Sequence, residues 1–294
     1  MGGTVTDYTR SASREVEYRS MSREQVFKAR EIHDSLNPFK LKVREARDSD
    51  VHPNTVPVIV AFDVTGSMGN IPYKLAQEHF TKLMIALIEN GVPDVTICFC
   101  AVGDHYYDSA PLQVGQFESG DIELTNDLTN IWLEGGGGGQ RMESYMLPWL
   151  FAARHTVTDA FEKRGKKGFL FTIGDEWNHP RVESAKLKKI LGYPEAEDEA
   201  SVQLLKEAQQ KWNVYHIHCS DGTYGEDISD KWKDLLGENL FILDSSKIVD
   251  LIATTVAVSQ GASEVQVKET LKNNSYVKED ITKVEDYHTV SFIK

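Results

Sequence analysis

The chain has 294 residues, 40% of them hydrophobic, and a formal net charge of −13 at pH 7. This length allows one large domain or two small ones, and the hydrophobic share is enough to bury a core. The negative charge argues against nucleic acid as a partner, because its phosphate backbone would be repelled. No apolar run approaches the roughly 20 residues of a membrane span, and no signal peptide opens the chain. We therefore expect a cytoplasmic protein without a membrane or nucleic-acid partner.

The first 52 residues are expected to form an N-terminal arm with a short helix. Residues 1–20 are polar and rich in Ser and Arg, with no pattern that builds a core, so we expect them to be extended or disordered. Apolar spacing predicts a helix over residues 22–36. The mixed charges of residues 44–50 are typical of a solvated surface segment.

The main domain is expected to begin with a strand buried on both faces, because residues 56–62 are almost continuously apolar. The strand stops at Asp63, and Thr65 and Ser67 follow in a short loop before an amphipathic helix that runs to about residue 90. Hard oxygen ligands on a short loop suit Mg²⁺, or Mn²⁺ in its place. The alternative is a turn in which Asp63 and Ser67 only cap the helix.

Strand and helix patterns alternate from residue 56 to residue 258. This alternation predicts an α/β fold, a doubly wound, Rossmann-like and mostly parallel sheet flanked by helices on both faces. Further strands are expected at residues 94–102, 167–173, 212–218 and 240–243, with a short antiparallel edge strand at 112–117. Further helices are expected at residues 121–133, from 144 to 162, and at 181–191, 196–211, 227–236 and 245–258. The tail, residues 259–294, could add an edge strand or lie over the domain.

The three cysteines do not suggest a disulfide framework. Cys98 and Cys100 alternate on one predicted strand, so their side chains share a face, and Cys219 ends another. Buried free thiols in a reducing cytoplasm are the expectation.

Two more loops carry polar groups at predicted strand or helix ends. Five glycines, residues 135–139, precede Glu143 and Ser144, but the Lys-Ser/Thr of a phosphate-binding loop is missing, so nucleotide binding is not expected. Asp175 comes directly after the predicted strand at 167–173. Open α/β sheets bind ligands at the carboxyl ends of their strands, so Asp63 and Asp175 are expected at one rim.

The stretch Asp63-Val64-Thr65-Gly66-Ser67 resembles the Asp-x-Ser/Thr-x-Ser signature of the metal-ion-dependent adhesion site in von Willebrand factor A domains. The resemblance covers about 200 residues and implies that Asp63 binds Mg²⁺ mostly through water, with Thr65 and Ser67 binding it directly. It also implies that Asp175 contributes from a third loop, and that a partner's carboxylate often completes the shell. The usual Asp-Gly order is reversed here, since Gly174 precedes Asp175.

The second metal loop departs from the family, because no Thr follows the glycines. If Ser144 takes that role, the site is ordinary and open to a partner's carboxylate. If Glu143 takes it, the protein adds its own negative charge, holds Mg²⁺ better alone and attracts an acidic partner less. We favour Glu143, and a purely helix-stabilising role for it stays open.

Several other polar groups are expected to be structural. Asp104, His105 and Asp108 follow a strand on the same rim; they could bind a second metal, but a hairpin turn with solvated charges is favoured. His216 and His218 alternate on a strand and are interpreted as core or edge histidines.

The resemblance implies a metal-dependent protein-binding module or adaptor, like cytoplasmic bacterial and phage proteins of this family, some of which recruit substrates to ATPases. One alternative is a Mg²⁺-dependent phosphohydrolase of the haloacid dehalogenase type. That chemistry needs a second Asp two residues after the first, where this chain has Thr65, so an enzyme is not expected. A structural subunit that assembles through residues 1–50 is another alternative. The partner and the oligomeric state stay open.

Overall fold

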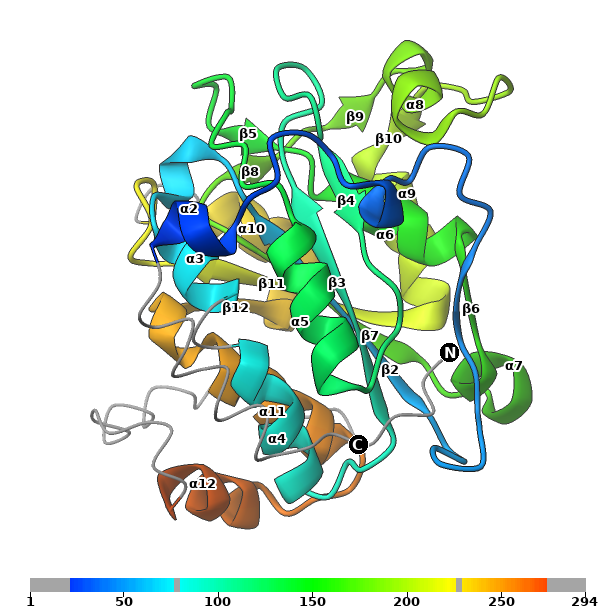
Figure 1. The fold of residues 1–294 in the computed structure, drawn as a ribbon, viewed down its shortest axis with the longest axis vertical. Helices are drawn as coiled ribbons and strands as arrows, with labels where there is room; N and C mark the ends of the chain where they lie inside the picture. The colour runs from blue at the N-terminus through cyan, green and yellow to red at the C-terminus, as the bar shows by residue number, and fades with distance from the viewer. Residues whose placement is uncertain (1–21, 77–79, 226–228, 274–294) are drawn as a thin grey trace.

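The computed structural model describes residues 22–76, 80–225 and 229–273. Its centre is a six-stranded sheet in the order β12-β11-β7-β2-β3-β4, in which every neighbouring pair is parallel except β3 and β4 (Figure 1). The strands are β2 (Val56–Asp63), β3 (Val95–Val102), β4 (Leu112–Val114), β7 (Gly168–Gly174), β11 (Trp212–Cys219) and β12 (Leu240–Leu243). The predicted doubly wound, mostly parallel α/β fold is confirmed.

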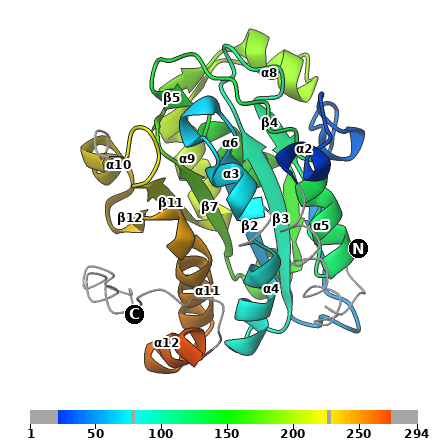
Figure 2. The same ribbon diagram turned by 60° about the vertical axis from the view of Figure 1, so that its left-hand side comes forward.

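Helices cover both faces of this sheet, and β2 shows why. Its residues alternate between two cores: Val58 and Phe62 belong to one, and Ile59 and Ala61 to the other. The first core is closed by α4 (Phe80–Glu89), α5 (Asp121–Asn130) and α11 (Ile248–Ser259). The second is closed by α6 (Met146–Arg154), α8 (Ser184–Leu191), α9 (Ser201–Lys211) and α10 (Ser229–Leu236), as Figure 2 shows from a second side. A strand buried on both faces must be apolar throughout, which explains the continuous apolar run.

Several short elements lie at the rim of the sheet where the parallel strands end. They are η2 (Gly66–Met68), α3 (Ile71–Lys74), β5 (Met142–Glu143), β8 (Trp177–Asn178), β9 (Arg181–Val182) and β10 (Glu199–Ala200). β5 pairs with β8 in parallel, and β9 pairs with β10 antiparallel. Two 3₁₀ turns, η4 (Gly237–Asn239) and η5 (Ser245–Lys247), flank β12.

The prediction of one helix from residue 144 to residue 162 is wrong, because a short strand divides this stretch into two helices. Helix α6 ends at Arg154, β6 (Thr156–Thr158) follows, and α7 (Asp159–Arg164) is a separate helix. The β-branched residues of β6 favour an extended backbone, and the Thr158 side chain caps α7 by accepting the amide of Phe161 at 3.3 Å.

Strand β6 pairs in parallel with β1 (Arg44–Ala46), so the expected solvated segment at residues 44–50 is wrong. The charges that follow β1 bind α7 while staying partly exposed, and the Arg47 side chain is 35% exposed. They form a network that we call the paired cluster, which consists of Arg47, Asp48, Asp159, Lys163 and Arg164. Asp159 lies 2.9 Å from Arg47 Nη1 and 2.7 Å from Lys163 Nζ, and Asp48 lies 2.5 Å from Arg164 Nη1.

Residues on either side of the expected main domain pack onto it. The single helix predicted at residues 22–36 is wrong; instead α2 (Arg23–Val26) and η1 (Asp34–Leu36) are separate, and Phe27 and Leu36 are buried in the first core. After residue 258, α12 (Glu264–Asn273) lies over the domain as a helix and buries Val267. The expected disordered arm, residues 1–20, and most of the tail lie outside the described residues.

Two further expectations concern the interior and the membrane. Cys98, Cys100 and Cys219 are buried and free, as predicted. Among the helices that the structure describes, none combines the length and the apolar character needed to cross a membrane.

Candidate metal centre

The loop after β2 holds Asp63 firmly at the rim of the sheet. Asp63 is fully buried, and its Oδ1 accepts both the amide and the hydroxyl of Thr65, each at 2.7 Å. Its other oxygen accepts the hydroxyl of Tyr145 at 2.8 Å. The carboxylate is therefore fixed in place before any ligand arrives.

Asp175 reaches the same loop from the end of β7. The Ser67 hydroxyl donates to Asp175 Oδ1 at 2.8 Å and lies 3.3 Å from the Thr65 hydroxyl. The loop after β11 approaches so closely that a Cβ at Gly222 would fall 2.4 Å from the Cβ of Asp175. The structure thus brings together Asp63, Thr65, Ser67 and Asp175, which sequence analysis had placed on one rim.

Glu143 joins these residues from the glycine-rich segment. That segment packs on the loop after β2, since the amide of Gly66 donates to the carbonyl of Gly136 at 2.9 Å. Glu143 is 1% exposed, and a Cβ built at Gly137 would contact both Glu143 Oε1 (3.3 Å) and Thr65 Cβ (3.5 Å). Among the described residues, Glu143 Oε2 has no hydrogen-bond partner.

Ser144, the other candidate for this role, faces away. Its hydroxyl accepts the amide of His105 at 2.8 Å and lies 2.8 Å from His105 Nδ1. Successive residues of an extended segment point to opposite sides, so only one of Glu143 and Ser144 can face Asp63. The geometry puts Glu143 there.

Glu176, to which the sequence patterns assigned no role, also lies at this place. It is 5% exposed, and burial followed by the charge of Asp175 raises its pKa to about 6. Its position directly after Asp175, at the end of a buried strand, was the available signal. We call Asp63, Glu143, Asp175 and Glu176 the acidic cluster.

The acidic cluster is electrostatically unfavourable as it stands. Burial, opposed by hydrogen bonds from Thr65 and reinforced by Asp175, raises the pKa of Asp63 to about 8. Burial, followed by the negative charges of Asp63 and Glu176, raises the pKa of Glu143 to about 12. No Lys or Arg in the described part of the chain forms an ion pair with these four carboxylates. Buried carboxylates without a cationic partner are costly, and a cation would relieve that cost.

The donor set fits a hard divalent cation. It consists of carboxylate and hydroxyl oxygens only, which suits Mg²⁺, Mn²⁺ or Ca²⁺ rather than a metal that prefers nitrogen or sulfur. The unpartnered Glu143 oxygen and the absence of a compensating side chain among the described residues both agree with such an ion. The residues present therefore fit the group that the sequence resemblance implies.

The neighbouring hairpin differs from its prediction. Asp104 and His105 are 0% and 3% exposed, so the expected solvated charges are wrong. Asp108 supports the glycine segment, because its Oδ1 accepts the amide of Gly137 at 2.7 Å and its Oδ2 accepts the amide of Asp104 at 2.7 Å. Asp104 and His105 instead meet His179, a residue that sequence analysis did not single out.

Comparison with known proteins gives distant structural likenesses only. No protein-family profile and no curated relative matches the chain. The pilus adhesin SpaC from Lactobacillus rhamnosus GG is similar in two crystal structures, with 10% and 9% identity and TM-scores of 0.46 and 0.47. These matches cover 74% and 73% of this chain and 31% of the adhesin chains, so the chain spans about a third of their length.

An aerotolerance-related membrane protein from Bacteroides fragilis NCTC 9343 is also similar. It has 14% identity and a TM-score of 0.42, and the match covers 68% of this chain and 98% of that one. At such low identities and TM-scores, these likenesses carry no inference about function, which has to come from the residues of this chain.

Proposed function

We propose that the chain is a metal-ion-dependent protein-binding module of the von Willebrand factor A type, which acts as an interaction or adaptor protein. The observation that carries the proposal is the acidic cluster, four buried carboxylates at or directly after the ends of β2, β5 and β7, without a cationic partner among the described residues. This is the rim at which open α/β sheets bind their ligands.

Asp63, Thr65, Ser67, Asp175 and Glu143 would hold Mg²⁺ or Mn²⁺. The bound ion supplies positive charge that offsets the buried carboxylates. Because Glu143 adds a negative charge of its own, the ion is more nearly neutralised than in a site with Thr at that position. The ion therefore serves mainly to order the rim, and less to capture a partner's carboxylate.

The partner would then bind the surface around the ion. Tyr107 is 54% exposed beside the glycine segment, and its hydroxyl accepts the side-chain amide of Gln140 at 2.6 Å. The guanidinium of Arg141 lies 4.8 Å from the ring centre of Tyr224. Tyr and Arg are the side chains that most often dominate protein interfaces. We do not extend the proposal to hydrolysis, because Thr65 stands where a phosphohydrolase needs a second Asp.

Metal binding is the first test. Calorimetry with Mg²⁺ and Mn²⁺ should show one bound ion in the wild type and none in Asp63→Ala/Asp175→Ala. The control, Asp230→Ala/Glu238→Ala, removes two exposed acidic side chains and should bind like the wild type. Equal binding by the wild type and the Asp63→Ala/Asp175→Ala variant contradicts the proposal.

Partner binding is the second test. A partner captured from a lysate by the wild type in Mg²⁺ should be lost in EDTA and with Asp63→Ala/Asp175→Ala, but kept with the control variant. Glu143→Thr restores the residue that the family has at this point, so it should bind metal more weakly and an acidic partner more strongly. A partner that binds equally in Mg²⁺ and EDTA would leave the metal without a role in recognition.

A further inference from the structure

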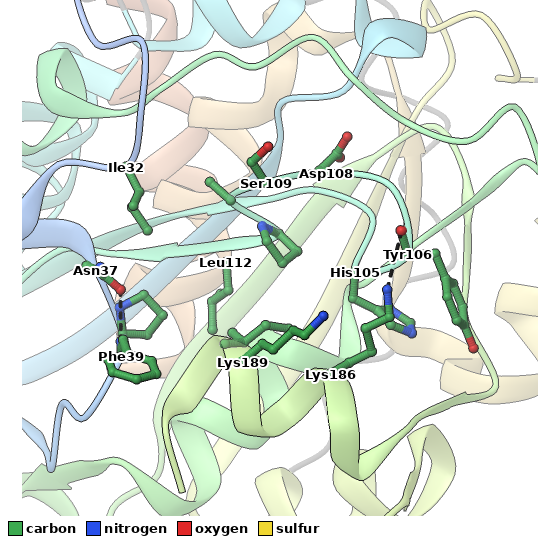
Figure 3. Close-up of a pocket in the computed structure, with 14 residues that line it drawn as sticks. Ile32, Asn37, Phe39, His105, Tyr106, Asp108, Ser109, Leu112, Lys186 and Lys189 are labelled. Atoms are coloured by element: carbon green, nitrogen blue, oxygen red, sulfur yellow. Dashed lines mark hydrogen bonds between the residues drawn. The ribbon is translucent and has the colours of Figure 1, made fainter.

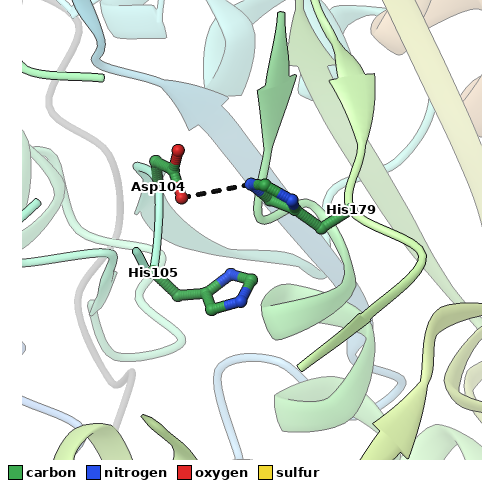
Figure 4. A group of neighbouring side chains, drawn as sticks. All are labelled: Asp104, His105 and His179. Carbon is green, nitrogen blue, oxygen red and sulfur yellow. Dashed lines mark hydrogen bonds and ion pairs between the residues drawn. The ribbon is translucent and has the colours of Figure 1, made fainter. Parts of the chain in front are cut away.

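A second group of metal-ligating side chains lies beside the acidic cluster, on the segments that follow β3 and β8. Asp104, His105 and His179 are 0%, 3% and 2% exposed. One ligand atom from each lies within 4.8 Å of the other two, and His179 Nε2 is 3.1 Å from Asp104 Oδ1 (Figure 4). Two imidazoles and a carboxylate so close together in the interior are unusual as packing groups.

Some polar atoms of this group have no hydrogen-bond partner among the described residues. In the part of the chain that the structure describes, Asp104 Oδ2 and His105 Nε2 have no hydrogen-bond partner. Glu183 Oε2 lies 3.7 Å from His105 Nε2 and lacks a hydrogen-bond partner as well. Buried polar atoms nearly always find partners, so unpartnered atoms at one place point to a group that would bind them.

The side chains are already oriented. His105 Nδ1 lies 2.8 Å from the Ser144 hydroxyl, and Asp104 Oδ1 accepts the amide of Tyr106 at 2.8 Å. Metal-ligating imidazoles and carboxylates are usually held by such outer hydrogen bonds.

We propose that Asp104, His105 and His179 bind a second metal ion of the zinc class, with Glu183 as a fourth ligand. Two nitrogen ligands favour Zn²⁺, Co²⁺ or Ni²⁺ over Mg²⁺, so this site differs in chemistry from the acidic cluster. Ligand atoms around Zn²⁺ are roughly 3.4 Å apart in a tetrahedron. His179 Nε2 and Asp104 Oδ1 are already closer than this, at 3.1 Å, so a metal would mainly draw in those ligand atoms of the group that lie up to 4.8 Å apart.

A cavity adjoins the buried cluster at His105. A cavity of about 340 Å³ is lined by His105 and Tyr106 on one side and by Lys186 and Lys189 of α8 on another (Figure 3). His105 thus lies between the buried cluster and the cavity.

The experiment uses Co²⁺ as a spectroscopic probe and the full chain. Asp63→Ala/Asp175→Ala should bind one Co²⁺ with the visible absorption bands of nitrogen coordination, and Zn²⁺ should displace it. His179→Gln should lower Co²⁺ affinity at least about 100-fold, since removing even an outer partner costs 10–100-fold. The control, His33→Gln, removes an exposed imidazole and should change nothing. Absent bands, or unchanged affinity in His179→Gln, overturn the proposal.

A measurement on the wild type covers the case in which His179→Gln does not fold. Zn²⁺ should shift the NMR signals of the His105 and His179 rings, while Mg²⁺ should not. Shifts confined to exposed histidines such as His33 overturn the proposal. The two proposals can fail independently of each other. His179→Gln should still bind Mg²⁺ at the acidic cluster if the proposed function is right, whatever happens to Zn²⁺ binding.

Discussion

In the described part of the chain, two groups of charged side chains lie near opposite ends of β2. The paired cluster lies where β2 begins, since Arg164 donates to the carbonyl of Thr55 at 3.0 Å. The acidic cluster lies where β2 ends, at Asp63. Asp159 in the paired cluster and Asp63 in the acidic cluster are both buried, and both are held by several hydrogen bonds.

The two clusters differ in the cations that the chain itself supplies. Burial by itself would raise the pKa of Asp159, but hydrogen bonds from Lys163, the Asp48 amide and Arg47 hold this pKa well below its usual range. In the acidic cluster, burial and neighbouring carboxylates raise the pKa of Glu143 to about 12. The comparison shows that burial alone does not distinguish the two clusters; what differs is whether the described residues supply a cation. The acidic cluster lacks one, and this is the reason for proposing an ion there.

The largest expected effect comes from giving the acidic cluster a cation of its own. Glu143→Lys places an ammonium among the remaining carboxylates, where it takes the place of the metal ion. Mg²⁺ affinity measured by calorimetry should fall at least about 100-fold. Glu238→Lys makes the same charge change at an exposed position and should not alter affinity. A change of less than twofold in Glu143→Lys would show that Mg²⁺ does not bind at this cluster.

The next effect comes from breaking the paired cluster. Asp159→Asn keeps the shape of the side chain but leaves Arg47 and Lys163 without their carboxylate. The free energy of unfolding should fall by about 2 kcal/mol, because hydrogen bonds to a charged group are lost. Chemical denaturation should give this loss equally in Mg²⁺ and in EDTA. Asp230→Asn, in an exposed ion pair, should cost less than about 0.5 kcal/mol.

The destabilisation caused by Asp159→Asn should also depend on pH. The pKa of Asp159 is lowered in the folded state, so its contribution is present above the usual Asp pKa of 3.8 and is lost as the pH falls below it. The stability difference between the wild type and Asp159→Asn should therefore shrink by about 1 kcal/mol between pH 7 and pH 3. A difference that grows on acidification would give the wrong sign for a paired carboxylate.

The smallest expected effect is an increase in the free energy of unfolding, opposite in sign to the loss expected for Asp159→Asn. Glu143→Gln removes a carboxylate from the acidic cluster, so in EDTA the free energy of unfolding should rise by about 0.5 kcal/mol. In Mg²⁺ the same variant should gain less from the ion than the wild type does. Thermal melts in both buffers test this, and a loss of stability in EDTA would indicate that Glu143 is compensated in the metal-free protein.

Local patterns in the sequence were enough to predict most of the fold and part of the acidic cluster. The continuous apolar run of β2 and the polar residues directly after it, Asp63, Thr65 and Ser67, are neighbours in sequence. Asp175 could be added because carboxyl ends of parallel strands share a rim. Glu143 was favoured over Ser144, but a purely helix-stabilising role for it stayed open, because its direction depends on the two-residue pairing of β5 with β8.

The paired cluster was missed for a related reason. Mixed charges such as Arg47 and Asp48 are typical of solvated surfaces, and their partners on α7 are more than a hundred residues away. The interruption between α6 and α7 likewise depends on the pairing of β6 with β1, which local propensity does not reveal. His179 carried no local signal, because only the fold brings it to Asp104.

The five glycines at residues 135–139 have a consequence for how related chains can diverge. Such a run resembles a linker whose length is free to vary. Here a Cβ at Gly136 would fall 2.0 Å from Asp108 Oδ1, and one at Gly138 would fall 2.1 Å from the Tyr107 ring. Inserting or deleting one residue would shift the following segment by one position, exchanging the directions of Glu143 and Ser144. Related chains that share the proposed ion site should therefore conserve the number of residues in this run, even where the sequence on either side differs.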